Sequence, residues 1–112
     1  MNKRILHLTL KKEWFKQIAQ NEKKQEFREV KPHWEKRFYH EDNGAIVESK
    51  YDEVHFRNGY AKDAPFMRVE CLGVDHMTNI KTPIGEGEFF VINLGEVLEI
   101  KNYKEPLQNA RN

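Results

Sequence analysis

The sequence lacks any long apolar segment and has a single cysteine, and both absences limit what the protein can be. No stretch of its 112 residues approaches the roughly 20 consecutive apolar residues that a transmembrane helix needs. The segment 1–4 leads into only a short apolar stretch before Lys11, which argues against a signal peptide. One cysteine, Cys71, permits no intramolecular disulfide and no cysteine-based zinc framework. We therefore expect a cytoplasmic protein with no membrane partner.

Histidines at the spacing of a metal-binding helix are also missing. The chain has five histidines, and none of them forms the H-E-x-x-H pattern that places two ligands on one helix face. Cys71 lies in the run 67–72, which is typical of strand interior, where cysteine usually serves as a small apolar core residue. The sequence therefore predicts no metal ion and no cofactor.

The residues that are abundant suit a small folded domain. Hydrophobic residues make up 38% of the chain and include two Trp, four Tyr and seven Phe, enough for a core despite a charged fraction of 33%. A chain of this length has room for one independent core. We expect a single domain over residues 1–112, with a frayed tail at 105–112.

The small net charge of +1 conceals an uneven distribution. Residues 1–40 carry eleven Lys and Arg against five Glu, a net charge of +6, whereas residues 41–112 carry eight against thirteen Asp and Glu, a net charge of −5. A basic N-terminal part can attract phosphate groups. Folding can equally interleave the two parts and cancel the field, so charge alone leaves both interpretations open.

Hydrophobic periodicity predicts the first two elements. Residues 4–10 alternate leucine with polar side chains, which is the period of a half-buried strand. In residues 11–20 apolar side chains recur at helical spacing with lysines on the opposite face, and Thr9 is a candidate N-cap. We expect this helix to end near Asn21, because asparagine tolerates the left-handed conformation that terminates many helices.

A second strand and a short helix follow. Residues 24–30 alternate so that Glu26 and Arg28 share one face of a strand. Residues 33–39 begin just after a proline and indicate a short helix, since proline is well tolerated in the first helical turn. Residues 40–49 have the composition of a loop around a turn.

The second half of the chain is rich in strand signals. Aromatic and β-branched residues between Gly and Pro predict strands over 51–57, 66–74 and 88–94, and a short one over 97–100. Strands outnumber helices and no βα unit repeats. We therefore predict an α+β fold, a small mixed β-barrel of five to six strands with one or two helices.

The most informative segment is 21–28, which reads Asn-Glu-Lys-Lys-Gln-Glu-Phe-Arg. It resembles the G-x-K-x-x-E-x-R signature of the ASCH domain family, whose barrel is related to the RNA-binding PUA domain. Lys23, Glu26 and Arg28 stand at the family's Lys, Glu and Arg positions. Asn21 replaces the glycine, a mild departure because asparagine also adopts positive φ.

The resemblance extends to the layout of residues 4–96. The signature follows the first strand and helix, and residues 89–94 resemble the family's closing strand. The resemblance implies a PUA-like barrel that binds RNA, a nucleotide or a modified nucleoside.

The signature residues also make chemical sense without the family. Glu26 and Arg28 share a strand face and Lys23 enters from the preceding turn, so two cations and a carboxylate can receive a phosphate and a base edge together. The alternative is an ion pair that only anchors the turn between helix and strand.

A second candidate cluster is Arg57-Asn58-Gly59-Tyr60. Arg57 and Asn58 beside the ring of Tyr60 can clamp a nucleotide by hydrogen bonding and stacking. The alternative is a turn that needs Asn-Gly for its backbone geometry. The basic stretch 31–37 has one aromatic residue, Trp34, which we expect in the core, while its Lys and Arg side chains can line the rim of a groove.

Three functions are compatible with these residues. The first is binding of RNA or a nucleotide at Lys23, Glu26 and Arg28, with no reaction. The second is a small amidohydrolase, since some ASCH-like proteins remove the acetyl group of acetylcytidine with a lysine, a threonine and a glutamate. Lys23 matches that lysine, but Glu26 stands at the threonine position, so Glu26 would have to act as a general base on water. The third is docking of a protein partner, which exposed Trp14, Phe66 or Phe89 would favour.

Overall fold

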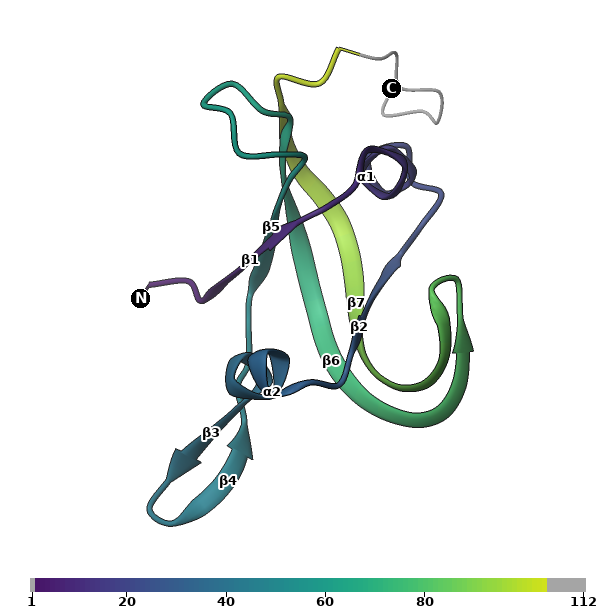
Figure 1. Ribbon diagram of the computed structural model, residues 1–112. Helices are drawn as coiled ribbons and strands as arrows, with labels where there is room; N and C mark the ends of the chain where they lie inside the picture. The colour runs from purple at the N-terminus through teal and green to yellow at the C-terminus, as the bar shows by residue number, and fades with distance from the viewer. Residues whose placement is uncertain (1, 105–112) are drawn as a thin grey trace.

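The computed structural model describes residues 2–104, so the tail expected at 105–112 lies outside the described residues. Within the described part there are two helices and seven strands (Figure 1). In chain order they are β1 (Ile5–Thr9), α1 (Lys12–Ala19), β2 (Gln25–Glu29), α2 (Pro32–Phe38), β3 (Tyr39–Asp42), β4 (Ala45–Glu48), β5 (Glu53–Arg57), β6 (Phe66–Thr82) and β7 (Gly85–Lys101). The predicted α+β class is confirmed.

Five strands form one mixed sheet in the order β1-β5-β6-β7-β2. β1 pairs with β5 in parallel, and the other three pairs are antiparallel. β1 and β2 therefore lie at the two edges of the sheet, and within residues 2–104 no backbone ladder joins them. The described strands form an open sheet, and the closed barrel expected from the strand pattern is not found among them.

The start of α1 differs from the prediction. The helix begins at Lys12 without a side-chain cap, so Thr9 is not its N-cap. The reason is that β1 runs through Thr9, and the backbone N–H of Leu10 donates to the carbonyl oxygen of Arg57 over 2.7 Å. This hydrogen bond keeps the chain extended up to the helix.

The end of α1 agrees with the prediction. Asn21 has a positive φ of 67°, in the left-handed region. The next two residues, Glu22 and Lys23, donate their backbone N–H groups to the carbonyl oxygen of Gln17 over 2.8 and 3.1 Å. The turn before β2 is therefore tied to the last turn of the helix.

Replacing Asn21 with alanine is expected to lower the free energy of unfolding by about 1 kcal/mol. The left-handed conformation costs most residues roughly 1–2 kcal/mol, and asparagine tolerates it better than alanine because its side-chain amide can hydrogen-bond locally. Glycine at the same position is expected to change it by less than about 0.5 kcal/mol, since glycine adopts positive φ readily. Urea denaturation of both variants measures the difference. Equal stabilities of the two variants would contradict the prediction.

Residues 40–49 form a hairpin, not the predicted loop. β3 and β4 pair antiparallel as a separate two-stranded sheet, which projects from the lower left of the molecule in Figure 1. Asn43 and Gly44 close it with positive φ values of 52° and 83°. Two consecutive positive φ values match the twist of paired strands, so the Asn-Gly pair is the sequence signal for this hairpin.

β6 and β7 are each 17 residues long and extend well beyond the predicted segments 66–74 and 88–94. Together they form a curved hairpin whose tip bends back toward β2 in Figure 1. Register shifts interrupt the ladder at four places, including between Met77 and Ile80. Such irregularities bend a strand pair and increase its twist. The bend brings the tip residues Pro83 and Ile84 to the cavity beside β2.

The core lies between the sheet and the two helices. α1 contributes Phe15 and Ile18, and α2 contributes Phe38, whose ring centroid lies 4.7 Å from that of Phe90 in β7. Burial of aromatic side chains such as these stabilises the fold in proportion to the apolar area removed from water, and favourable contacts between the rings add to this stabilisation. The two helices are thus fixed at either end of β2, which joins them.

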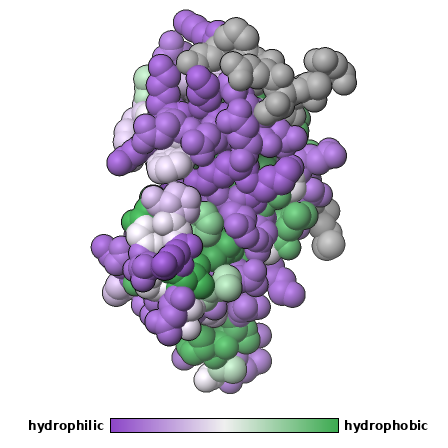
Figure 2. Space-filling model, turned by 90° about the vertical axis from the view of Figure 1, so that its right-hand side faces the viewer, coloured by the Kyte–Doolittle hydropathy of each residue, from purple (hydrophilic) through white to green (hydrophobic). Residues whose placement is uncertain are grey.

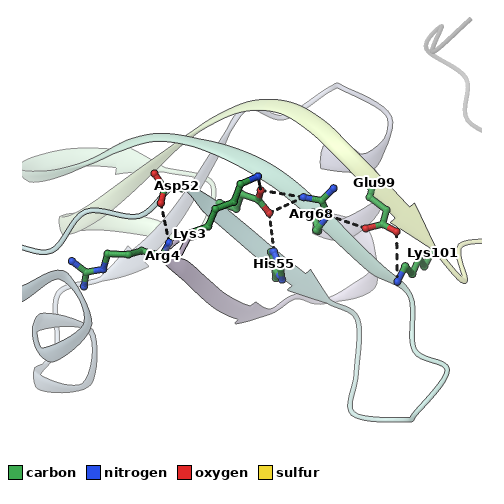
Figure 3. A network of polar contacts seen from close by, with 8 residues as sticks. Lys3, Arg4, Asp52, His55, Arg68, Glu99 and Lys101 are labelled. Atoms are coloured by element: carbon green, nitrogen blue, oxygen red, sulfur yellow. Dashed lines mark hydrogen bonds and ion pairs between the residues drawn. The ribbon is translucent and has the colours of Figure 1, made fainter. Parts of the chain in front are cut away.

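A buried carboxylate, Glu53 at the start of β5, is contacted by Lys3, His55 and Arg68, whose side chains converge in Figure 3. It accepts hydrogen bonds from Lys3 at 2.7 Å, from His55 at 3.0 Å and from Arg68 at 2.9 and 3.0 Å. Arg68 also donates to Glu99 over 2.8 Å, which links β6 to β7. The hydrogen bond from Lys3, followed by those from His55 and Arg68, lowers the pKa of Glu53 to about 2.

One face of the molecule is hydrophilic in its upper part, and apolar side chains gather in its lower half (Figure 2). The exposed large apolar side chains are Ile46, Tyr60, Leu72, Met77, Ile84 and Leu98. Trp14 and Phe66 are half-buried and Phe89 is buried, so none of the three aromatic residues considered for protein docking is exposed. No helix in residues 2–104 combines the length and the apolar character needed to cross a membrane.

Candidate functional site

Lys23, Glu26 and Arg28 come together at the edge of the sheet formed by β2. The ammonium group of Lys23 lies 2.9 Å from Oε1 of Glu26. The guanidinium group of Arg28 donates to Oε2 of Glu26 through Nε at 3.1 Å and Nη2 at 2.9 Å. Each carboxylate oxygen is therefore held by a different cation.

Local structure explains this convergence. Glu26 and Arg28 are two residues apart on β2, where they pair in register with Ile92 and Phe90 of β7, so both side chains leave the strand on the same face. Lys23 comes from the turn that Asn21 closes. The helix, the turn and the strand are contiguous in the sequence, which is why sequence reasoning could place these three residues together.

The three charged groups are largely removed from water. The exposed fractions of their side chains are 11% for Lys23, 7% for Glu26 and 21% for Arg28. Surface ion pairs contribute little, but a charge at this degree of burial is expensive to leave unpaired. The arrangement is therefore a desolvated charge cluster with one excess positive charge.

An indole ring lies against each cation. The Lys23 ammonium is 4.3 Å from the ring centroid of Trp14, and the Arg28 guanidinium is 5.0 Å from that of Trp34. These are cation–π distances. Trp34 was predicted as a core residue, and the structure shows that both tryptophans pack against the core while lying beside the charge cluster.

Arg28 also bridges the two edges of the sheet. Its Nη2 donates to the carbonyl oxygen of Thr9 at the end of β1, over 3.1 Å. Since no ladder joins β1 and β2 in residues 2–104, this side chain makes a polar connection where a closed barrel would have backbone hydrogen bonds. The charge cluster therefore lies at the opening between the sheet edges.

A cavity of about 320 Å³, which we call the Glu26 cavity, opens at this point. Its walls are the end of β1, Trp14, the signature residues of β2 and the hairpin tip at Pro83 and Ile84. This volume lies at the lower end of the range for small-molecule sites and suits a ligand the size of one nucleobase.

A second cavity of about 590 Å³, which we call the His7 cavity, adjoins the first. Both cavities are lined by Lys11 and Arg28 and by the end of β1, so they are adjacent, and we call the two together the groove. Asn58 and Tyr60 from the second candidate cluster line the His7 cavity. Asn58 is fixed there because its side-chain amide donates to the carbonyl oxygen of Leu10 over 2.9 Å.

Arg57 does not share this location. Its guanidinium group lies 5.2 Å from the ring centroid of Phe66, and it lines neither cavity. Arg57 is the last residue of β5, whereas Asn58 and Tyr60 lie in the loop that follows it. Tyr60 is exposed and leaves its ring face accessible from the groove.

Three acidic residues later in the chain, Glu70, Glu86 and Glu88, line neither cavity of the groove. Glu70 accepts a hydrogen bond from the backbone of Glu96, Glu86 lies 3.9 Å from Lys81, and Glu88 pairs with His76. Within residues 2–104, the carboxylates at the groove are therefore Glu26 and the exposed Glu29.

A different polar cluster, which the sequence did not indicate, is formed by Tyr39, His76 and Glu88. The hydroxyl of Tyr39 is 2.9 Å from Nδ1 of His76, and Nε2 of the same ring pairs with Glu88. Burial, and then nearby glutamates, raise the pKa of Tyr39. The cluster joins the start of β3 to the long hairpin.

We compared the chain with protein-family models, with curated proteins and with solved structures, and none of them matches it. Among residues 2–104, no three or more His, Cys, Asp or Glu side chains are grouped so that they can hold a metal ion. The function is therefore argued from the geometry of the groove.

Proposed function

We propose that this protein is a cytosolic ASCH-type protein that binds RNA or a modified nucleoside, with the base in the Glu26 cavity. The observation that carries the proposal is the desolvated cluster of Lys23, Glu26 and Arg28, whose two cations each lie against an indole ring. A cluster that only anchored a turn would not need a cavity beside it.

The chemistry of the cavity suits a base edge. Glu26 offers carboxylate lone pairs to an amino or imino N–H, while Lys23 and Arg28 have further N–H groups to donate to ring nitrogens or carbonyl oxygens. Trp14 lies in the wall, where an aromatic face favours stacking of a base. In such sites hydrogen bonds distinguish one base from another, whereas stacking on an aromatic ring stabilises any base.

The fold is consistent with a PUA-like barrel that is incompletely closed. β1 and β2 form the two edges, and the contact of Arg28 with the carbonyl oxygen of Thr9 connects them. A ligand in the Glu26 cavity would contact both edges at once. In this proposal, the incomplete closure creates the binding site.

Hydrolysis of an acylated nucleoside such as acetylcytidine is the alternative function. The contact of 2.9 Å between Lys23 and Glu26 favours it, since Glu26 could take a proton from water while the ammonium group of Lys23 stabilises the oxyanion. Against it, both oxygens of Glu26 already accept hydrogen bonds from cations, so neither oxygen is left free to take a proton from water. Binding without reaction is therefore the preferred function.

The first test is binding of cytidine, acetylcytidine and a short single-stranded RNA to the wild type and to Lys23→Ala and Arg28→Ala. We expect each variant to bind about tenfold more weakly, because a hydrogen bond from a charged group is lost. Lys24→Ala is the matched control, since the side chain of this exposed neighbour donates to the turn residue Asn21 and lines neither cavity. Equal affinities of all variants would contradict the proposal, and release of acetate from acetylcytidine would establish the enzyme alternative.

RNA binding is expected to be weak and sensitive to salt. The net charge is only +1 and the basic residues at the groove are few, so the slope of log affinity against log salt should correspond to a few phosphate contacts. Fluorescence anisotropy at several salt concentrations measures this slope. An affinity that does not change with salt would argue instead for a neutral nucleoside or a protein partner.

A further inference from the structure

Basic side chains dominate the lining of the His7 cavity. Lys11, Arg28 and Arg37 line it together with His7 and His33, and none of its described lining residues is acidic. The adjoining Glu26 cavity, in contrast, contains two glutamates. The groove therefore changes from mixed charge at one end to positive charge at the other.

Two of these cations are not neutralised by the protein. Arg28 is paired with Glu26, but within residues 2–104 neither Lys11 nor Arg37 forms an ion pair with a carboxylate. Arg37 lies on α2 with its guanidinium group 5.9 Å from the ring centroid of Trp34. Lys11 and Arg37 thus remain available to a ligand that enters from solvent.

His7 responds to the same positive surroundings. Burial lowers the pKa of His7, and three neighbours lower it further: His55, Arg37 and Arg57. The ring of His7 packs edge-on against that of His55 at 5.4 Å, and His55 is itself held by Glu53. His33 packs against Trp34 on the other wall.

We propose that the His7 cavity is an anion subsite that binds the phosphate of a nucleotide whose base lies in the Glu26 cavity. The inference rests on the proposed function for the position of the base, but the positive cavity stands without it. Arg28 and Thr9 lie between the two cavities, so a nucleotide can span them without changing the fold. Arginine and lysine are the usual partners of phosphate oxygens, and Asn58 adds an amide at the same wall.

The first experiment compares cytidine with cytidine 5′-monophosphate by calorimetric titration at fixed ionic strength. We expect the monophosphate to bind about tenfold more tightly, because the phosphate gains charge-assisted hydrogen bonds. Arg37→Ala is expected to remove this advantage while leaving the affinity for cytidine unchanged. The hydrogen bond from Tyr51 to the backbone oxygen of Arg37 does not depend on the side chain, so this variant should fold normally.

Lys36→Ala is the matched control for this comparison. Lys36 lies on the same helix, is exposed and lines neither cavity, so its removal takes away one positive charge at a distance from the proposed phosphate. The tenfold advantage of the monophosphate should persist in Lys36→Ala. Equal losses in Lys36→Ala and Arg37→Ala would overturn the inference, because they would show a general charge effect.

The second experiment uses inorganic sulfate and needs no base. The charge of sulfate is constant between pH 5 and pH 8, and an anion beside His7 favours the imidazolium form, so sulfate should raise the pKa of His7 in an NMR titration. Arg37→Ala should reduce this rise. The result would overturn the inference if sulfate left the pKa of His7 unchanged or raised it equally in Arg37→Ala.

The two experiments separate this inference from the proposed function. If neither cytidine nor its monophosphate binds but sulfate raises the pKa of His7 through Arg37, the base site fails and the anion subsite stands. If cytidine and its monophosphate bind equally well and Lys23→Ala weakens the binding of both, the base site stands and the anion subsite is wrong.

Discussion

Replacement of Glu26 by glutamine is expected to lower the free energy of unfolding by about 2–4 kcal/mol at neutral pH. The carboxylate is buried and holds Lys23 on one oxygen and Arg28 on the other. A glutamine amide can accept from one of them, but its NH₂ group then faces the other cation, so two positive charges lie close together without compensation. The loss is at the lower end for a buried charge pair because both cations retain some contact with water.

Chemical denaturation of Glu26→Gln and of the matched control Glu29→Gln tests this prediction. Glu29 is exposed on the same strand, so its replacement should change the stability by less than about 0.5 kcal/mol. If the two variants have the same stability, the Glu26 carboxylate does not hold the cluster together.

The same substitution separates binding from catalysis. If the protein only binds its ligand, Glu26→Gln should weaken binding of a nucleoside by about 1–3 kcal/mol, because a buried hydrogen bond to the base edge is lost. If it hydrolyses acetylcytidine, turnover should fall by roughly 10²- to 10⁴-fold with little loss of affinity, since the general base is removed while the contacts remain. Binding assays and acetate release, measured on protein that is folded under the assay conditions, distinguish the two outcomes.

Replacement of Glu53 by glutamine is expected to lower the free energy of unfolding by about 1–3 kcal/mol at pH 7. Glu53 is buried at the start of β5 and receives hydrogen bonds from Lys3, His55 and Arg68. Its loss would release the N-terminal segment from the sheet at Lys3 and free Arg68 from one of its two carboxylates. Thermal unfolding should show a decrease in Tm of several degrees, roughly 4–8 °C for each kcal/mol.

The contribution of Glu53 should also depend on pH. Its pKa in the folded protein, about 2, lies below the ordinary value of 4.5. The folded state therefore binds this proton less readily than the unfolded state, so the stabilisation is fully present above about pH 4.5 and is lost as the pH falls through about 2. Between pH 5 and pH 2 the wild type should lose more stability than Glu53→Gln, which has no carboxylate to protonate.

Glu99→Gln is the control for this series. Glu99 also binds Arg68, and this hydrogen bond lowers its pKa, but its side chain is partly exposed. We expect a smaller change in stability at pH 7 and a pH dependence close to that of the wild type. A larger effect for Glu99→Gln than for Glu53→Gln would show that Glu53 is not the central group of the network.

Elements whose signals are local were predicted well. The alternation around β1, the helical stripe of α1 and the positive φ of Asn21 each depend on a few neighbouring residues, and the structure has all three. The predicted strands were too short where distant pairing decides how far a strand extends. β6 and β7 support each other over 17 residues, including polar stretches that carry no strand signal alone. The β3–β4 hairpin was missed because the Asn43-Gly44 pair was interpreted as part of a loop.

The candidate site likewise has one part that follows from local sequence and another that depends on the packing of distant segments. Lys23, Glu26 and Arg28 lie within six residues, and a turn followed by a strand is enough to bring them together, so the sequence by itself determined the charge cluster. The cavities depend on contacts between segments far apart in the chain: the end of β1, the tip of the long hairpin, α2 and the loop after β5. Only the tertiary structure decided that Trp14 and Trp34 lie against the cations and that the positive end of the groove lacks acidic side chains among its described residues. The physical reason is that side-chain direction follows from local backbone geometry, whereas the position of one element against another depends on how the whole core packs.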